Sequence, residues 1–338
     1  MKKAFGTLPT GETAYTYTIS NGIITAEVSD YGATLVRLFV PDKNGKLADV
    51  VLGYEDVNGY ANSTTYFGAT VGRNANRIRK GTFQLNGKAV QLPINNHSNN
   101  LHSGPDSYAY RFWEVVEHQQ NSIIFALNSP DGDQGFPGNA RIRVTYSIIG
   151  TSTLSIAYDA ISNKDTVFNL TNHSYFNLAG HERTEMAMQQ TLSMGARFFN
   201  PSDAESVPTG VLQSVEGTPM DFRTPKAIGR DLDADFEPFR LQGGYDHNFE
   251  VFCSPAAILR DPESGRTMAV STDLPGMQFY SGNYLKDQGK DGVYYPKRSG
   301  IALETQFYPD SVNHPEWPQP FTPANTPWHS ETWYEFSY

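Results

Sequence analysis

The sequence holds a single cysteine among 338 residues, so no disulfide can form within the chain. No apolar run is long enough to span a bilayer, and no apolar segment follows the two lysines near Met1. We therefore expect a cytoplasmic protein without a membrane partner. The cysteine, Cys253, ends an apolar and strand-like run that begins at Phe249, which predicts a buried and unreactive thiol.

Basic residues are scarce as well. The chain has 26 Lys and Arg against 36 Asp and Glu, and its formal net charge is -10. Nucleic acids and anionic membranes bind basic surfaces, so we expect neither as a partner. The sequence also lacks the Gly-x-Ser-x-Gly, Gly-x-x-x-x-Gly-Lys and Gly-x-Gly-x-x-Gly motifs of serine nucleophiles, nucleotide phosphates and dinucleotides. A small neutral substrate fits this composition better than a polyphosphate does.

Apolar residues with helical spacing are missing almost everywhere, and we expect only short helical turns near residues 231–236. Alternation with a period of two is common instead. Asn86-Gly87 predicts a hairpin turn between residues 82–85 and 88–92, and residues 142–148 and 154–158 predict an antiparallel pair. Many strands joined by turns predict an all-β sandwich or barrel. Because no linker divides the chain, we expect one domain over residues 1–338.

The stretch from Asn169 to Leu178 starts like a strand and then becomes rich in polar residues around His173. Two asparagines, a serine and a tyrosine can fix the imidazole ring, and apolar neighbours can shift its pKa. A core histidine satisfied by hydrogen bonds would show the same pattern. A carboxylate next to this histidine would raise its pKa and favour the charged form.

A second candidate is Glu304, in the largely apolar stretch 300–307. Alternation places Glu304 on the face of Ala302 and Gln306, opposite Ile301 and Leu303. A carboxylate in the middle of an apolar strand costs free energy unless it is paired or has a chemical use. Glu304 is therefore the carboxylate that most needs a function.

Three further clusters are polar. Residues 72–78 contain two arginines, whose planar donors suit hydroxyls and carboxylates, although a solvated turn would look alike. Residues 97–105 hold two histidines, but no cysteine or nearby carboxylate completes a familiar metal site, so we expect no metal. In residues 243–249, Asp246 lies beside aromatic residues, which suits paired sugar hydroxyls, or it caps a turn.

Taken together and in this order, the motifs resemble the aldose 1-epimerase (galactose mutarotase) family. The resemblance covers essentially the whole chain and rests on six motifs, Gly72–Gly81, Leu101-His102, Asn169–Gly180, Gly244–Phe249, Pro275–Tyr280 and Leu303–Gln306. It implies a large antiparallel β-sandwich with few short helices and a sugar cleft on one face. Where the family usually has Leu-His-Gly-Gly, this chain has Ser103 after His102, so the resemblance does not fix the conformation of this loop or the sugar preference.

The resemblance also assigns roles. It implies that Glu304 is the general base and His173 the general acid of a reaction that opens and closes an aldohexose ring and so exchanges its anomers. It implies further that the sugar is held by Arg77, His102, Asp246, Gln278 and Asn76. No cofactor or metal is expected, the partner is a monosaccharide such as galactose or glucose, and the protein is a monomer or a homodimer.

Three other functions remain open from the residues alone. A glycoside hydrolase or lyase would use two carboxylates, and Glu304 and Asp246 could serve. A non-catalytic sugar-binding module would need only Asp246 and aromatic residues, but it leaves Glu304 without a purpose. An epimerase of hexose 6-phosphates would need a basic phosphate pocket, which this acidic chain does not indicate.

Overall fold

The computed structural model describes all residues from Met1 to Tyr338. Alternating sequence produces two of its three longest strands, β13 (Ala140–Ile149) and β14 (Thr153–Ser162), which pair antiparallel over their full length. Along β13, buried residues alternate with exposed or half-buried ones, so one face packs inward and the other meets solvent. The antiparallel pair expected from residues 142–158 is confirmed.

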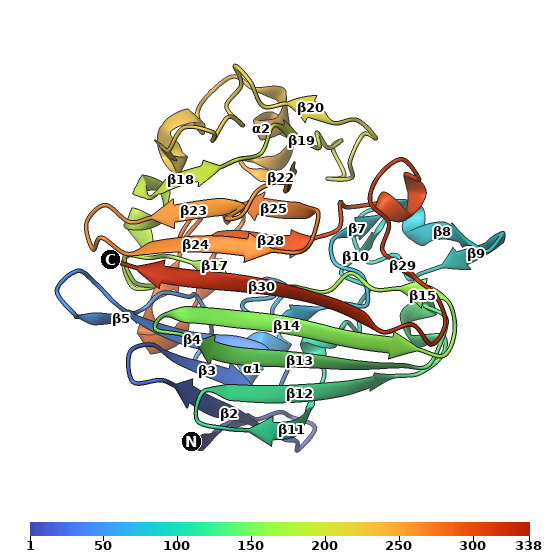
Figure 1. Cartoon of the computed structure of the whole chain (residues 1–338), viewed down its shortest axis with the longest axis horizontal. Coiled ribbons are helices and arrows are strands. Elements are labelled where there is room, and N and C mark those ends of the chain that lie inside the picture. The colour runs from blue at the N-terminus through green and yellow to red at the C-terminus, as the bar shows by residue number, and fades with distance from the viewer.

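These two strands belong to a nine-stranded antiparallel sheet, which lies at the front in Figure 1. Its strands in spatial order are β11 (Glu114–His118), β12 (Ser122–Ser129), β13, β14, β30 (Trp328–Ser337), β24 (Thr267–Thr272), β23 (Ala257–Arg260), β18 (Thr191–Met194) and β21 (Lys226–Ala227). The last long strand of the chain, β30, therefore pairs with both β14 and β24 and joins two regions far apart in the sequence.

Two other sheets lie behind it. One has five strands in chain order, β1 (Lys2–Thr7), β2 (Thr13–Ser20), β3 (Thr25–Ser29), β4 (Thr34–Pro41) and β5 (Leu47–Asp49). The other has six strands in the order β17 (Tyr175–Phe176), β28 (Ile301–Gln306), β25 (Gly276–Tyr280), β22 (Asp246–Glu250), β19 (Phe198–Phe199) and β20 (Gln213–Ser214). One apolar cluster of 51 buried residues draws on all three sheets. The expected antiparallel β-sandwich is confirmed.

Short strand pairs complete the fold. They are β6 (Thr70–Val71) with β16 (Thr171–Asn172), β7 (Arg77–Ile78) with β10 (Asn100–Leu101), β8 (Thr82–Leu85) with β9 (Lys88–Gln91), β15 (Thr166–Val167) with β29 (Phe321–Thr322), and β26 (Asp287–Gln288) with β27 (Tyr294–Tyr295). The pair β8–β9 is the hairpin expected at Asn86-Gly87. Both turn residues have positive φ, 52° and 73°, as a type I′ turn requires.

Helices are few and short. The α-helices are α1 (Val57–Ala61) and α2 (Glu237–Gln242), and a 3₁₀ turn covers Ile228–Asp231. The helical turns expected near 231–236 thus lie on either side of that range, with the 3₁₀ turn before it and α2 after it. The helix α1 was not expected. Each α-helix is at most six residues long and shows no repeating apolar pattern, which explains both errors.

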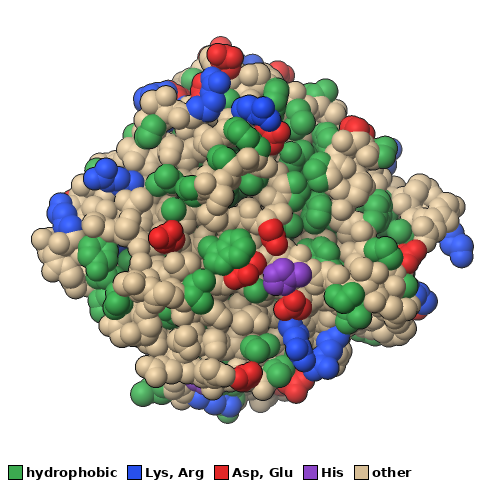
Figure 2. All heavy atoms as spheres, viewed as in Figure 1, with side chains coloured by type: hydrophobic (Ala, Val, Ile, Leu, Met, Phe, Trp, Pro, Cys, Tyr) green, Lys and Arg blue, Asp and Glu red, His purple; other side chains and the backbone are tan.

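The expectation for Cys253 is wrong, because this cysteine is exposed. Strand β22 ends at Glu250, and Phe252 is half exposed, so the apolar run of the sequence leaves the sheet before it reaches the thiol. The face of the molecule that shows the nine-stranded sheet carries acidic, basic and hydrophobic side chains, and near its centre one histidine lies among acidic side chains (Figure 2). None of the helices has the length and apolar character that a membrane crossing demands.

Candidate active site

A polar cavity of about 350 Å³ brings together side chains from distant parts of the chain. Six of the seven residues predicted for the site line this cavity, namely Asn76, Arg77, His102, His173, Asp246 and Glu304. The seventh, Gln278, lies directly behind the cavity wall and contacts Asp246. Residues 97–102 and 204–242 contribute further parts of the wall, whereas residues 310–330 do not reach it.

Glu304 projects into the cavity from β28, which lies between β17 and β25. Its neighbour Leu303 belongs to the apolar core, so the alternation of the strand turns Glu304 away from that core. Glu304 is 2% exposed, and its Oε2 accepts no hydrogen bond. Burial and the nearby Asp246 raise the pKa of this carboxyl well above its usual range, while Arg77 opposes the shift.

His173 faces Glu304 from the segment between β16 and β17. Its Nε2 lies 3.6 Å from Glu304 Oε2, and the imidazole is buried. Burial lowers the pKa of His173 to about 4. The expectation that a neighbouring carboxylate would raise this pKa is therefore wrong, because burial of the ring disfavours its charged form. Both shifts act in the same sense, because burial favours the uncharged form of each group.

The backbone holds His173 in place. The His173 N–H donates to Ala69 O over 2.9 Å, and the Gly68 N–H donates to His173 O over 2.9 Å. Asn172, the preceding residue, donates from Nδ2 to Gly68 O over 2.7 Å and accepts from the Ser174 hydroxyl over 2.6 Å. The polar residues of the predicted motif thus satisfy the backbone around the histidine and leave its ring for the cavity.

His102 lies beside the pair and has a defined tautomer. Its Nδ1 accepts from the Asn76 N–H over 3.1 Å, so the proton of the neutral ring is on Nε2. Burial holds the pKa of His102 well below its usual range. One potential ligand atom each of His102, His173 and Glu304 lies within 4.8 Å of the others, a spacing that suits a metal ion. However, Nδ1 of His102 already accepts a hydrogen bond and its Nε2 carries the proton, so neither nitrogen has a free lone pair for a metal. His102 is therefore better suited to donate a hydrogen bond than to bind a metal.

Asp246 and Arg77 contribute side chains of opposite charge to the cavity wall. Asp246 Oδ1 accepts from Gln278 Nε2 over 2.7 Å, so Gln278 orients the carboxylate although it does not line the cavity. Burial raises the pKa of Asp246, and Arg77 opposes this. Arg77 itself is oriented by Asn96, whose Oδ1 accepts from Arg77 Nε over 3.0 Å.

Four tyrosines that line the cavity were not predicted as site residues, namely Tyr66, Tyr175, Tyr280 and Tyr284. The ring of His173 stacks with the rings of Tyr66 and Tyr175, with centroid separations of 5.8 Å and 5.1 Å and an angle of 23° to each ring. Both tyrosines line the cavity. Tyr175 lies in the predicted motif, but nothing singled it out, and Tyr66 is one of 19 tyrosines without a distinctive neighbour.

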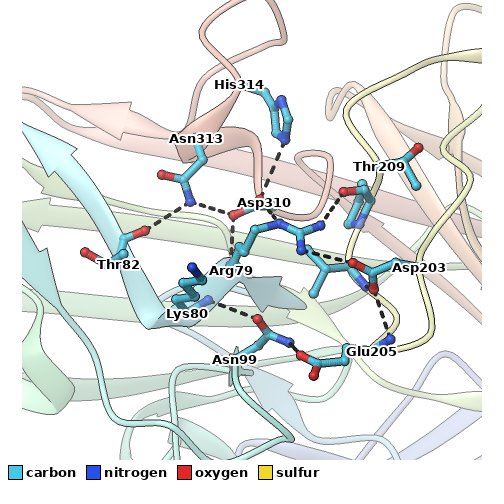
Figure 3. A network of polar contacts seen from close by, with 12 residues as sticks. Arg79, Lys80, Thr82, Asn99, Asp203, Glu205, Thr209, Asp310, Asn313 and His314 are labelled. Atoms are coloured by element: carbon cyan, nitrogen blue, oxygen red, sulfur yellow. Dashed lines mark hydrogen bonds and ion pairs between the residues drawn. The ribbon is translucent and has the colours of Figure 1, made fainter.

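A polar network joins segments that are adjacent in sequence to residues of the cavity wall (Figure 3). Arg79 is paired with Asp203 over 3.0 Å, and its backbone N–H donates to the buried Asp310 over 2.9 Å. On the other side, Asn99 Nδ2 donates to Glu205 over 2.7 Å, which links the loop of His102 to the loop of Ser206. The network thus fixes two wall segments relative to β7, which carries Arg77.

A larger hollow of about 430 Å³ lies elsewhere, beside Arg37 and Asp291. Charged groups of this hollow already have polar partners within the protein. Arg37 binds Asp291 through two hydrogen bonds of 2.6 Å and 2.9 Å, and Arg266 donates to Leu178 O over 2.9 Å. The first cavity, with its free acid and base groups, is therefore the better candidate for an active site.

The sandwich and its buried imidazole–carboxylate pair define a β-sandwich protein equipped for acid–base chemistry on a polar ligand. The sequence model of the aldose 1-epimerase family matches residues 15–335. Galactose mutarotase of Mus musculus is 39% identical over 99% of this chain and 98% of its own, and aldose 1-epimerase of Escherichia coli is 36% identical over 94% and 93%. The chain therefore belongs to the aldose 1-epimerase family.

Solved structures agree with this assignment. A crystal structure of the GalM/aldose epimerase homologue from C. elegans superimposes with a TM-score of 0.89 at 31% identity, over 96% of this chain and 99% of that one. The galactose 1-epimerase of Lactobacillus acidophilus gives 0.87 at 26% identity, over 100% and 98%. The similarity thus extends over the complete sandwich and not over a single motif.

Proposed function

We propose that this protein is an aldose 1-epimerase that interconverts the α and β anomers of aldohexoses such as galactose and glucose. Membership of the family supports the reaction, and one geometric observation supports the mechanism. Glu304 and His173 present a carboxyl oxygen and an imidazole nitrogen 3.6 Å apart in a shared cavity. The two oxygens that must exchange protons in a cyclic hemiacetal, O1 and O5, are bonded to the same carbon, so a closely spaced acid and base suit them.

The reaction needs a carboxylate and an imidazolium. Transfer of a proton from the carboxyl group of Glu304 to the imidazole of His173 would create this form without changing the net charge, and Arg77 favours the carboxylate. Glu304 then takes the proton of the C1 hydroxyl, and His173 gives its proton to the ring oxygen as the C1–O5 bond breaks. The open aldehyde turns about C1–C2 and closes on its other face, with the two protons returning along the reverse path.

The remaining polar side chains hold the sugar in this proposal. Asp246 and the Nε2–H of His102 offer an acceptor and a donor for ring hydroxyls, and Arg77 offers further donors. Asn76 sets the tautomer of His102, and Gln278 sets the rotamer of Asp246. Such support of binding groups by their neighbours keeps the geometry fixed before the sugar arrives.

Polarimetry of freshly dissolved α-galactose or α-glucose tests the proposal. We expect the wild type to speed the relaxation of optical rotation without a new product. Glu304→Gln and His173→Asn each remove one proton-transfer group and should lower kcat by about 10²–10⁴-fold. The matched controls Glu117→Gln and His329→Asn alter exposed residues far from the cavity and should leave kcat unchanged. Near-full activity of either site variant would contradict the assigned roles.

We also infer a cytoplasmic location. The only cysteine is exposed and unpaired, which suits a reducing compartment better than an oxidising one. Fractionation of source cells, followed by immunodetection in the cytosolic and membrane or extracellular fractions, tests this inference. Recovery outside the cytosol would contradict it.

A further inference from the structure

Tyr66 has an unusual backbone for a large residue. Its φ is 57°, in the left-handed region that non-glycine residues seldom adopt. The strain is held by the turn that follows, in which the Ala69 N–H donates to Tyr66 O over 3.0 Å. Ala69 and Gly68 in turn bond the backbone of His173. Strained conformations of this kind persist where surrounding contacts fix them, and they concentrate at functional sites.

The strained turn places the Tyr66 ring against both histidines of the cavity. Its centroid is 5.8 Å from that of His173 in a stacked arrangement, and 4.8 Å from that of His102 in an edge arrangement. Tyr175 also stacks with His173, with their centroids 5.1 Å apart. An aromatic face carries negative charge density, so it attracts a cation within about 6 Å of its centre.

From this geometry we propose that Tyr66 is a positioning residue, whose ring face orients His173 and stabilises the imidazolium that forms during proton transfer. The inference rests on the proposed function, which requires His173 to carry a proton in one step of each cycle. Burial works against that step, since it holds the pKa of His173 at about 4. A stacked aromatic face offsets part of this cost without adding a charge to the cavity.

Other groups face His173 and share its electrostatics. Glu304 lies across the 3.6 Å gap, the His102 ring centroid is 5.4 Å away, and Arg77 and Asp246 line the same cavity. Tyr175 is deeply buried among core aromatics, so its removal would disturb the fold. Tyr66 is only half buried, which makes it the ring that can be changed cleanly.

The experiment compares three substitutions in the full-length protein. Tyr66→Phe keeps the ring face, Tyr66→Leu replaces it by an aliphatic group, and Tyr66→Gly removes it while suiting the positive φ. The readouts are kcat and KM for galactose by polarimetry from pH 5 to 8. A second readout is the NMR titration of His173, identified by the loss of its signal in His173→Asn.

We expect Tyr66→Phe to keep kcat within about twofold of the wild type. Tyr66→Leu and Tyr66→Gly should lower kcat about tenfold, with a smaller change in KM, and His173 should titrate at lower pH in both. Tyr284→Leu removes another aromatic residue from the cavity wall that does not stack on His173, so it should leave the titration of His173 unchanged.

Two outcomes would overturn the proposal. One is an unchanged His173 titration in Tyr66→Leu and Tyr66→Gly, and the other is an equal loss of kcat in Tyr66→Phe, which would assign the effect to the hydroxyl. The glycine variant guards against misfolding, because it relieves the strained backbone. If the wild type showed no mutarotase activity, the proposed function would fail, but the titration would still test the role of Tyr66 toward His173.

Discussion

Single residues on β22 show how one strand serves two environments. Asp246 faces the cavity, whereas His247 packs its ring against Phe199 with the centroids 5.8 Å apart. His247 Nδ1 accepts from the Asp246 N–H over 3.1 Å, and its Nε2 has no partner. Burial lowers the pKa of His247 to about 3, far below the usual 6.5. His247 is therefore a neutral side chain of the interior that acts on Asp246 through the backbone.

This lowered pKa predicts a pH-dependent stability. Below pH 6.5 the unfolded chain binds a proton at residue 247, but the folded chain does not until about pH 3. The contribution of a neutral His247 is thus complete above pH 6.5 and is lost as the pH falls toward 3, at up to about 1.4 kcal/mol per pH unit. We expect His247→Gln to reduce this decline when the free energy of unfolding in urea is measured between pH 7.5 and 4.5.

The exposed His329 is the matched control, because His329→Gln removes a histidine without removing a buried one. The free energy of unfolding of the His329→Gln variant should change with pH as that of the wild type does. Curves for His247→Gln that run parallel to the wild type over this pH range would show that His247 is protonated equally in both states.

Residue-level properties were the hardest to predict from the sequence. Glu304 stood out because a carboxylate on an apolar strand needs a reason, and the structure buries it. The pKa of His173 was predicted with the wrong sign, because the sequence does not say how deeply the ring is buried. Cys253 was placed inside for a similar reason, since an apolar run does not reveal where its strand ends.

At the scale of elements, the loop after β10 contains Ser103, at the position where the resemblance to the family predicts a glycine. Ser103 is fully buried with φ at 72°, so it keeps the left-handed conformation that glycine would adopt. Its Oγ accepts from the Asn74 N–H over 2.8 Å and donates to Asn74 O over 3.0 Å. These two bonds join the loop of His102 to the segment of Asn76 and compensate for the strained backbone.

Two substitutions separate these effects. Ser103→Ala removes both hydrogen bonds and keeps a side chain at positive φ, so it should cost about 1–3 kcal/mol of unfolding free energy for the unpaired Asn74 groups. Ser103→Gly loses the same bonds but relieves the strain, and should be about 1 kcal/mol more stable than Ser103→Ala. Urea unfolding measures the difference. A glycine variant no more stable than the alanine variant would show that the positive φ carries no cost here.

Elements with local rules were predictable. The β8–β9 hairpin follows from Asn86-Gly87, and the β13–β14 pair follows from uninterrupted alternation on both strands. The helices α1 and α2 were not, because one or two turns cannot display a helical period. The strand order of the nine-stranded sheet was also out of reach, since β30 inserts between β14 and β24 through contacts distant in sequence.

At the scale of the whole molecule, the cavity exists only when the chain is folded. Its walls come from segments between residues 64 and 304. His173 is far from Glu304 in the sequence, and Arg77 is far from Asp246. Composition and alternation could not place them together. The resemblance to a family did so, because it carries information about contacts that a single sequence does not display.

This distributed site predicts that a hexose stabilises the entire fold. A ligand that binds only the folded chain adds RT ln(1 + [L]/Kd), or about 2.7 kcal/mol at a hundredfold excess over Kd. We expect saturating galactose to raise the Tm of the wild type by a few degrees in a thermal melt. Asp246→Ala removes charged hydrogen bonds worth about 1.5–3 kcal/mol each, so the same galactose concentration should raise its Tm much less. Mannitol at equal concentration, which has hydroxyls but no ring, controls for general solvent effects. An equal galactose-dependent shift in the wild type and in Asp246→Ala would remove Asp246 from the binding site.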